Sequence, residues 1–179
     1  MRTLPWLLVI ALAACSSPDP VEGDLADPQA IYIAPDKLVE DVQEIADWRC
    51  RTGMTAQVVP LSEALDGGSG PDDAAKLRDY LTTRWEGGAL EYVILAGDAG
   101  AVPTRHVHAT VNVEAEQVYE EADVLSDLYF ADLDGDWDSD GDGAYGELDD
   151  DFDLLPDLAI GRLPVETAYE VAIYADKIQ

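Results

Sequence analysis

Two consecutive strand-and-helix units in the first half of this 179-residue chain limit its fold more than any other feature. Short apolar runs at residues 30–34, 55–59 and 92–96 have the length and composition of buried strands. Amphipathic segments lie between them, the first from Asp36 to a stop at Gly53 and the second from Pro71 to a stop at Gly87. Repeated βα units imply a parallel sheet with right-handed crossovers, so we expect an α/β domain.

The helix starts carry capping signals. Asp36 is a candidate N-cap for the first helix, and Asp72 and Asp73 follow Pro71 at the start of the second. Beyond Asp98 the pattern changes. Residues 105–113 alternate polar and apolar side chains, which predicts a half-exposed strand with His106 and His108 on its polar face. A strand at 158–165 and a helix from Glu166 are expected to follow.

The charge of the chain is strongly negative, with a formal net charge of −28 at pH 7. Lys and Arg are absent between Arg105 and Arg162, whereas eleven of the twenty-two residues from Asp132 to Asp153 are acidic. Such a field repels nucleic acid and anionic lipid and attracts divalent cations. We therefore exclude nucleic acid as a partner.

The acidic segment 132–147 contains the spacing of a calcium-binding loop. Counted from Asp136, acids stand at positions 1, 3 and 5, glycine at 6 and glutamate at 12. Calcium prefers six to eight oxygen ligands, and this spacing supplies them on a tightly turning chain. The predicted ligands are the side chains of Asp136, Asp138, Asp140 and Glu147 and the backbone carbonyl of Asp142. Gly141 would permit the turn.

Two alternatives weigh against a catalytic calcium. The segment could be a solvated acidic loop without a metal, since acidic runs usually are solvated. A bound calcium in such a loop also more often stabilises a fold than takes part in chemistry. The flanking residues do not form an obvious pair of amphipathic helices, so we expect an isolated loop and not a helix-loop-helix domain.

The first fifteen residues have the form of a bacterial lipoprotein leader. Arg2 precedes an apolar core at 4–13, and Leu12-Ala-Ala-Cys15 resembles a lipobox in which Cys15 is lipidated and becomes the new N-terminus. The alternative is an ordinary secretory signal with Cys15 incidental. Ser16 after the cysteine points to the outer membrane or cell surface. Residues 16–29 are rich in Pro, Asp and Ser and predict a flexible tether.

Few residues offer themselves for catalysis. Cys50 is placed near a helix C-terminus, where the dipole raises a thiol pKa, so we interpret it as a packing residue and not as a nucleophile. His106 and His108 are interpreted as surface residues, with binding of a second metal as the alternative. Asp98, which follows an apolar strand, is a weak candidate for substrate binding because ligands of parallel sheets bind at the carboxyl ends of strands.

Three segments together resemble the gingipain family of secreted cysteine endopeptidases. They are Tyr92-Val-Ile-Leu-Ala-Gly-Asp-Ala-Gly-Ala-Val-Pro-Thr104, Ser126-Asp-Leu-Tyr-Phe-Ala-Asp-Leu-Asp-Gly-Asp-Trp-Asp138 and Leu155-Pro-Asp-Leu-Ala-Ile-Gly-Arg-Leu-Pro-Val165. The opening Ile31-Tyr-Ile-Ala-Pro-Asp-Lys-Leu-Val39 also fits the family. The resemblance covers residues 30–179, the whole of the predicted domain.

The resemblance implies a caspase-like three-layer α/β fold with a mostly parallel sheet, of which this chain would hold the first subdomain only. In that family a His-Gly pair and a cysteine lie downstream of the Gly-Arg-Leu-Pro-Val segment. No His-Gly pair occurs here, so no catalytic residue is carried over, and we expect truncation before the catalytic subdomain. The implied function is proteolysis of protein or peptide substrates by the larger enzyme, with the membrane reached only through the lipid anchor. The rival is a non-catalytic, calcium-stabilised surface lipoprotein that acts as a binding or scaffold module.

Overall fold

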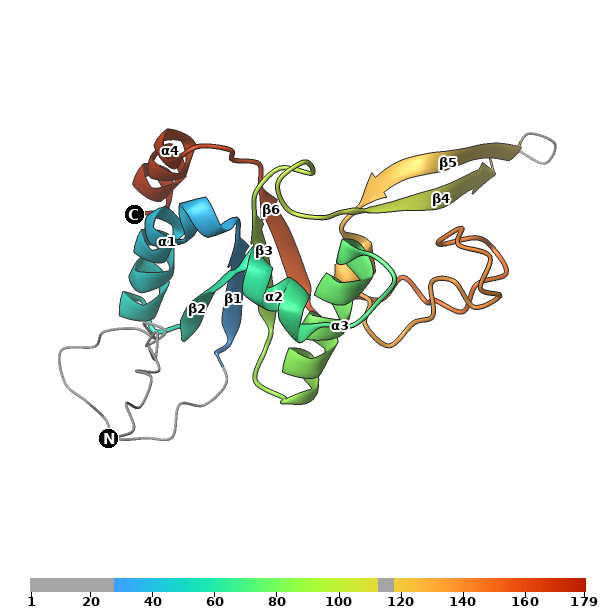
Figure 1. Ribbon diagram of the computed structural model, residues 1–179, viewed down its shortest axis with the longest axis horizontal. Helices are drawn as coiled ribbons and strands as arrows, with labels where there is room; N and C mark the ends of the chain where they lie inside the picture. The colour runs from blue at the N-terminus through green and yellow to red at the C-terminus, as the bar shows by residue number, and fades with distance from the viewer. Residues whose placement is uncertain (1–27, 113–117) are drawn as a thin grey trace, which may run out of the picture.

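The computed structural model describes residues 28–112 and 118–179 (Figure 1). The predicted leader at 1–15, with Cys15, and all but the last two residues of the tether at 16–29 lie outside the described residues. The described chain forms a central parallel sheet with helices on both faces and a separate antiparallel hairpin at one end.

The central sheet has four parallel strands in the order β2-β1-β3-β6. These strands are β1 (Ala30–Ala34), β2 (Ala56–Pro60), β3 (Tyr92–Ala96) and β6 (Ala159–Leu163). All five residues of β1 are buried, because the strand has a neighbour on each side and a helical layer on each face. In the register, Tyr32 pairs with Val58 on one side and Ile94 on the other. The expected strands are confirmed to within one or two residues.

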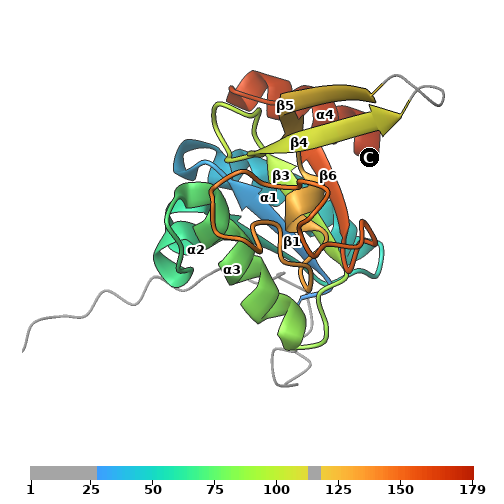
Figure 2. The ribbon, with the colours of Figure 1, turned by 90° about the vertical axis from the view of Figure 1, so that its right-hand side faces the viewer.

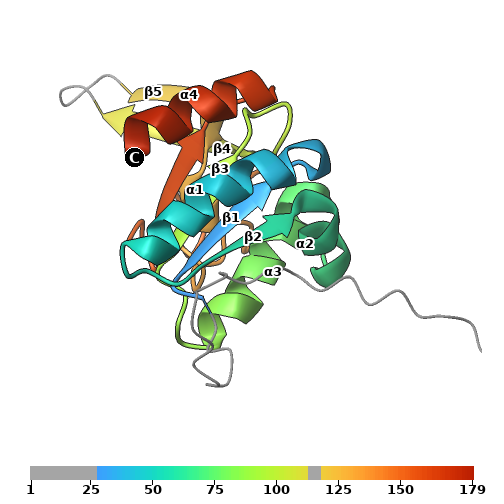
Figure 3. The same ribbon diagram turned by 90° about the vertical axis from the view of Figure 1, so that its left-hand side faces the viewer.

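Helices cover both faces of this sheet. Helices α1 (Val39–Arg51) and α4 (Ala168–Ile178) lie on one face, whereas α2 (Leu61–Gly67) and α3 (Asp73–Glu86) lie on the other (Figures 1 and 3). Alternate strand residues therefore enter two cores. Ile31 and Ile33 pack toward α2 and α3, and Tyr32 packs toward α1 and α4. The expected α/β fold with a mostly parallel sheet is confirmed, and the three layers follow from these strand runs that are apolar on both faces.

The start of α3 agrees with the predicted helix opening at Pro71, Asp72 and Asp73. Its N-cap is Asp72, whose Oδ1 accepts a hydrogen bond from the Ala75 amide at 2.8 Å. Helix α4 begins with a capping box between Thr167 and Glu170. The prediction that Asp36 caps the first helix is wrong. A 3₁₀ turn, η1 (Asp36–Leu38), precedes α1, and the Asp36 carboxylate instead accepts a hydrogen bond from the Ser62 amide at 3.2 Å.

Strands β4 (Arg105–Asn112) and β5 (Val118–Ser126) pair antiparallel as a hairpin that stands apart from the central sheet (Figures 1 and 2). His106 is exposed and Val107 is buried, so the predicted half-exposed strand is confirmed. A bulge between Val107 and Ala109 interrupts the regular pairing. A short 3₁₀ helix, η2 (Leu128–Phe130), then leads into the acidic segment.

No helix in the described parts of the chain combines the length and the apolar character needed to cross a bilayer.

Candidate functional site

The guanidinium of Arg162 on β6 joins segments that are far apart in the sequence. It forms a two-pronged ion pair with Asp127, with Nε–Oδ2 and Nη2–Oδ1 distances of 2.8 and 2.7 Å. Its other bonds go to carbonyl oxygens of the loop after β3, at Gly97 (2.9 Å), Asp98 (3.0 Å), Val102 (3.0 Å) and Pro103 (2.9 Å). A planar guanidinium offers five donors in a fixed fork, which suits this set of acceptors. Arg162 therefore fixes the loop at the carboxyl end of β3.

Asp98 lies in this loop, as its position after β3 predicted. Its Oδ1 accepts a hydrogen bond from the Gly100 amide at 3.0 Å. The hydrogen bond that a protonated Glu166 donates to the Asp98 carboxylate, together with the negative charge of that carboxylate, raises the pKa of Glu166, which follows β6. The two acids thus sit together at the carboxyl edge of the parallel sheet. The substrate role of Asp98 stays a prediction.

A second buried arginine attaches the hairpin to the helical layer. Arg105 is only 7 % exposed, and its Nη1 and Nη2 donate to Asp72 at 2.8 and 2.9 Å. The guanidinium also lies over the rings of Tyr145 and Tyr129, at 3.9 and 4.6 Å from their centroids. The hydrogen bond from Arg105 lowers the pKa of Asp72 below its usual value. Asp72 therefore caps α3 and neutralises Arg105 at once.

The cysteine and the histidines of the described chain are not brought together. Cys50 lies on α1 and packs with the core between α1, α4 and the sheet. His106 and His108 lie on β4, at the opposite end of the molecule (Figure 1). His106 pairs with Asp123 on β5, and His108 approaches Glu147 with an Nδ1–Oε1 distance of 3.7 Å. This placement agrees with the interpretation that the three residues form no catalytic pair.

Residues 132–153, between η2 and β6, pack around an aromatic cluster. Trp137 is 3 % exposed and stacks on Phe152 with ring centroids 4.5 Å apart. Tyr129 meets the Trp137 ring edge-on at 5.8 Å. No helix flanks residues 136–147 in this part of the chain, so the expectation of an isolated loop is confirmed. The stacking of Trp137 on Phe152 therefore holds the two ends of residues 132–153 together, although most of the other side chains of this segment are charged.

Three of the five predicted calcium ligands converge. Carboxylate oxygens of Asp138, Asp140 and Asp142 lie within 4.8 Å of one another. Gly141 adopts a φ of 75°, which bears out the need for glycine at the turn. Asp142 differs from the expectation, because its carboxylate joins the cluster where only its backbone carbonyl was expected to bind. The residues present fit a hard cation, since calcium binds carboxylate oxygens in such loops.

Asp136 and Glu147 lie outside this three-carboxylate cluster. Asp136 accepts the Asp138 amide at 3.2 Å, and its backbone pairs with Asp151 across an isolated bridge. Burial and the negative charge of Asp142 raise the pKa of Glu147. The Glu147 Oε1 lies 3.7 Å from His108 Nδ1, and Asp136 shapes the loop by accepting the Asp138 amide.

Asp150 connects the start and the end of the loop, and no sequence pattern predicted this role. Asp150 accepts hydrogen bonds from the backbone amides of Ser139 (2.8 Å), Gly146 (3.0 Å) and Glu147 (2.9 Å). It stands in the run Asp149-Asp150-Asp151, where nothing in the spacing distinguishes it from its neighbours. Its partners at the start and end of the loop become visible only in three dimensions.

The sequence profile of peptidase family C25 matches residues 24–179. The chain belongs to peptidase family C25. Gingipain R2 of Porphyromonas gingivalis (strain ATCC BAA-308 / W83) is 28 % identical over 91 residues, which cover 50 % of this chain and 11 % of that protein. The chain therefore spans about a tenth of this curated relative.

Solved structures of two Porphyromonas gingivalis proteins have a similar fold. The complex of the pro- and mature domains of Porphyromonas gingivalis RgpB superposes with a TM-score of 0.56 at 18 % identity, covering 83 % of this chain and 28 % of that one. Latent dimeric PorU from the same species gives a TM-score of 0.54 at 22 % identity, with coverage of 84 % and 15 %. The gingipain resemblance and the caspase-like α/β fold are thus confirmed.

The three gingipain-like segments meet in space. Arg162 from the third segment holds Asp127 from the second and the carbonyls of 97–103 from the first. In this C25 chain the three segments of the gingipain-like pattern therefore contact one another at the carboxyl edge of the sheet.

Proposed function

We propose that this chain is the leading, non-catalytic subdomain of a gingipain-like cysteine endopeptidase, in which it frames the site that cleaves peptide bonds. The observation that carries the proposal is the C25 match over residues 24–179 together with the shared fold. The chain covers only a part of each relative named above, and its own Cys50 and histidines lie at opposite ends of the molecule. The nucleophilic Cys and the base His would therefore come from residues other than these.

In this proposal the described residues hold the loop 97–103 in place and take no part in the chemical step. The ion pair of Arg162 with Asp127 and the four carbonyl contacts hold the loop 97–103 rigidly at the carboxyl edge of the sheet. Ligands of open parallel sheets bind at this edge. Asp98 and Glu166 give the edge a negative potential, which favours a substrate with a basic group.

The test is proteolysis by the full-length protein that contains this chain. We expect it to digest casein, and we expect alkylation of its thiols to stop the digestion. The matched variant Asp98→Asn keeps the shape of the loop and should raise KM for basic substrates more than it changes kcat. If the full-length protein leaves casein intact under reducing conditions, the result would instead support the rival function. That rival is a non-catalytic calcium-stabilised surface lipoprotein that acts as a binding or scaffold module.

We also propose that calcium binds at Asp138, Asp140 and Asp142, with Glu147 at the rim, and stabilises the acidic segment. Three carboxylates that lie this close repel one another, and a divalent cation would remove that repulsion. Extracellular modules of this kind bind calcium with dissociation constants on the order of 10⁻⁴–10⁻³ M. The ion would act on the stability of the fold and not on the chemical step.

A thermal melt tests the calcium proposal. Adding calcium to the chelated chain should raise its melting temperature, and the double variant Asp138→Asn with Asp140→Asn should reduce the rise. Asp123→Asn, which removes an exposed acid of the hairpin, serves as the control and should keep the full rise. An equal response in all three proteins would show that the loop does not hold the ion.

The leader supports a proposal on location. Lipidation of Cys15 would anchor the protein to the bacterial cell envelope, at the outer membrane or cell surface, or else cleavage nearby would release it as a secreted protein. Acyl chains contribute about 0.8 kcal/mol per buried methylene, so several chains on one residue hold a protein stably. Metabolic labelling with a radioactive fatty acid should mark the parent and leave Cys15→Ala unlabelled. The net charge of −28 makes nucleic acid an unsuitable partner.

A further inference from the structure

We propose that strand β5 is a docking edge for an extended, basic segment of a partner polypeptide, which adds to the hairpin as a third strand. The hairpin projects from the body of the molecule (Figures 1 and 2). Within the described residues, β5 pairs with β4 on one side and with no strand on the other. Such an edge presents backbone amides and carbonyls that an extended peptide can pair with. The proposal concerns binding alone and requires no cleavage.

The opposite edge of the hairpin is already covered. The amide of His108 on β4 donates to the carbonyl oxygen of Tyr145 at 2.8 Å. The ring of His108 also approaches Glu147, with an Nδ1–Oε1 distance of 3.7 Å. The acidic segment 132–153 therefore borders β4, which leaves β5 as the outer strand of the hairpin.

The base of the hairpin is fixed to the rest of the molecule at both of its strands. At the start of β4, Arg105 donates to Asp72 at 2.8 and 2.9 Å. Just before it, the Thr104 hydroxyl donates to the Asp127 carboxylate at 3.2 Å, and Asp127 follows the end of β5. Arg162 binds the same carboxylate. An edge that is held in place before binding loses less conformational entropy when a partner strand is added.

The side chains of β5 select the chemistry of the partner. Glu120, Glu121, Ala122 and Asp123 are all exposed, and Leu125 exposes 53 % of its surface beside them. The strand contains no Lys, Arg or Pro. Like charges that face each other across paired strands are destabilising, so a second copy of β5 does not fit this edge. A segment with Lys or Arg next to apolar residues does fit it.

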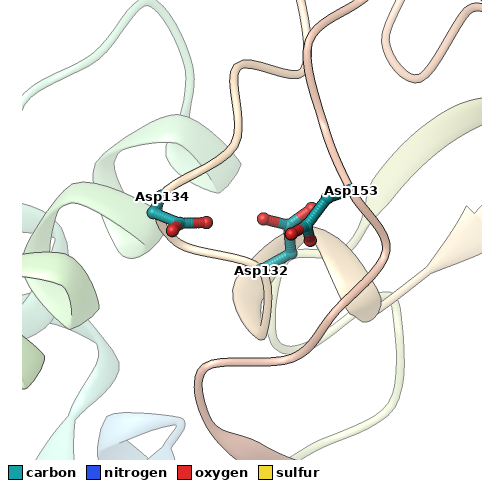
Figure 4. A group of neighbouring side chains, drawn as sticks. All are labelled: Asp132, Asp134 and Asp153. Carbon is teal, nitrogen blue, oxygen red and sulfur yellow. The ribbon is translucent and has the colours of Figure 1, made fainter.

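The acidic segment next to β4 strengthens the negative field around the hairpin. Carboxylate oxygens of Asp132, Asp134 and Asp153 lie within 4.8 Å of one another, and Figure 4 shows them gathered between two passes of the chain. Lys and Arg are absent between Arg105 and Arg162. A field of one sign steers an oppositely charged partner and excludes partners of the same sign. The whole end of the molecule thus favours a basic polypeptide.

Peptide binding to the 179-residue chain tests the proposal. The probe is a short fluorescent peptide of alternating Lys and Val with blocked ends. Its binding is followed by fluorescence anisotropy at about 0.15 M salt, where exposed charges more than about 8 Å apart are largely screened. The control peptide has Pro in place of each Val, so it keeps the charge but cannot pair as a strand. We expect the Lys-Val peptide to bind more tightly than the Lys-Pro peptide by about tenfold or more.

Reversal of charge on β5 should weaken binding of the Lys-Val peptide. For Glu120→Lys with Glu121→Lys we expect a loss of affinity of about tenfold or more, because like charges would then meet across the paired strands. The matched control is Glu86→Lys with Glu91→Lys, which makes the same change in net charge at exposed positions before the amino end of β3. This control should bind the peptide as the parent does.

Hydrogen exchange distinguishes pairing with the strand edge from contact with side chains alone. Successive amides of a strand point to opposite edges, so the bound Lys-Val peptide should slow the exchange of alternate amides of β5 in NMR spectra. The proposal is overturned if exchange in β5 is unchanged at saturating peptide. It is also overturned if the two peptides bind equally, or if both double variants lose equal affinity, since either result indicates general attraction by charge. Casein digestion by the full-length protein is measured separately, so failure of the proposed proteolysis is distinguishable from failure of this docking edge.

Discussion

At the scale of single residues, the structure depends on charges that serve two neighbours at once. Asp72 caps α3 through the Ala75 amide and also pairs with Arg105, which is buried between two tyrosine rings. A buried guanidinium without its carboxylate is strongly unfavourable. The hairpin and the helical layer therefore depend on one exposed aspartate.

Asp72→Asn separates the two roles, because Asn caps helices as well as Asp but carries no charge. We expect the free energy of unfolding to fall by about 1–2 kcal/mol, since hydrogen bonds to charged groups contribute about 1.5–3 kcal/mol and Asp72 is half exposed. Urea unfolding at neutral pH measures this. Asp73→Asn, next to it on the exposed start of α3, should have little effect.

The same pair predicts a pH dependence. Because Arg105 lowers the pKa of Asp72 in the folded state, its stabilisation is fully present above the ordinary aspartate value of 3.8 and is lost as pH falls through the lower folded value. The stability difference between parent and Asp72→Asn should therefore shrink as pH falls below about 4. A difference that stays constant down to pH 2 would mean that Asp72 carries no charge-dependent role.

At the scale of elements, Arg162 sets how β6 meets the loop after β3. One side chain binds Asp127 with two bonds and four carbonyl oxygens with the rest. Lysine cannot reproduce this fork, because its ammonium is a compact charge with three donors. The geometry of the carboxyl edge thus depends on arginine and not on charge alone.

We expect Arg162→Lys to lower the free energy of unfolding by about 2–4 kcal/mol, because several buried carbonyls and Asp127 lose their donors. Arg51→Lys, on the exposed end of α1, is the matched control and should change stability by less than about 0.5 kcal/mol. Chemical denaturation of both variants measures the contrast. Equal stabilities for the two would show that the fork of bonds contributes nothing.

The sequence predicted the elements that depend on residues close to one another in the chain. The strands at 30–34 and 92–96 are fully apolar runs, and Asp72 stands directly before its helix, so both were predictable. The spacing of Asp138 and Asp140 likewise predicted neighbouring carboxylates, whereas the side chain of Asp142 was not expected to join them. The roles of Arg162 and Asp150 were not predictable, because their partners are tertiary. Helix α2 was missed because it has seven residues, too few for a clear helical periodicity.

At the scale of the whole molecule, the net charge of −28 opposes the compact state. Screening shortens the reach of this repulsion, from a Debye length of about 30 Å at 0.01 M salt to about 3 Å at 1 M. Salt should therefore raise the melting temperature of the calcium-free chain by several degrees, and less so once calcium is bound. Choline chloride in place of sodium chloride should act equally, and a response to sodium alone would indicate ion binding and not screening.

On the function proposed above, this chain frames a cysteine-peptidase site without supplying its nucleophile. The full-length protein that contains this chain is labelled with a thiol-reactive peptide probe, and the labelled residue is mapped by mass spectrometry. Casein hydrolysis by the parent is then compared with hydrolysis by Cys50→Ala. We expect the label on a cysteine other than Cys15 or Cys50, and we expect Cys50→Ala to hydrolyse casein at the parent rate. A label on Cys50, with hydrolysis abolished by Cys50→Ala, would contradict it.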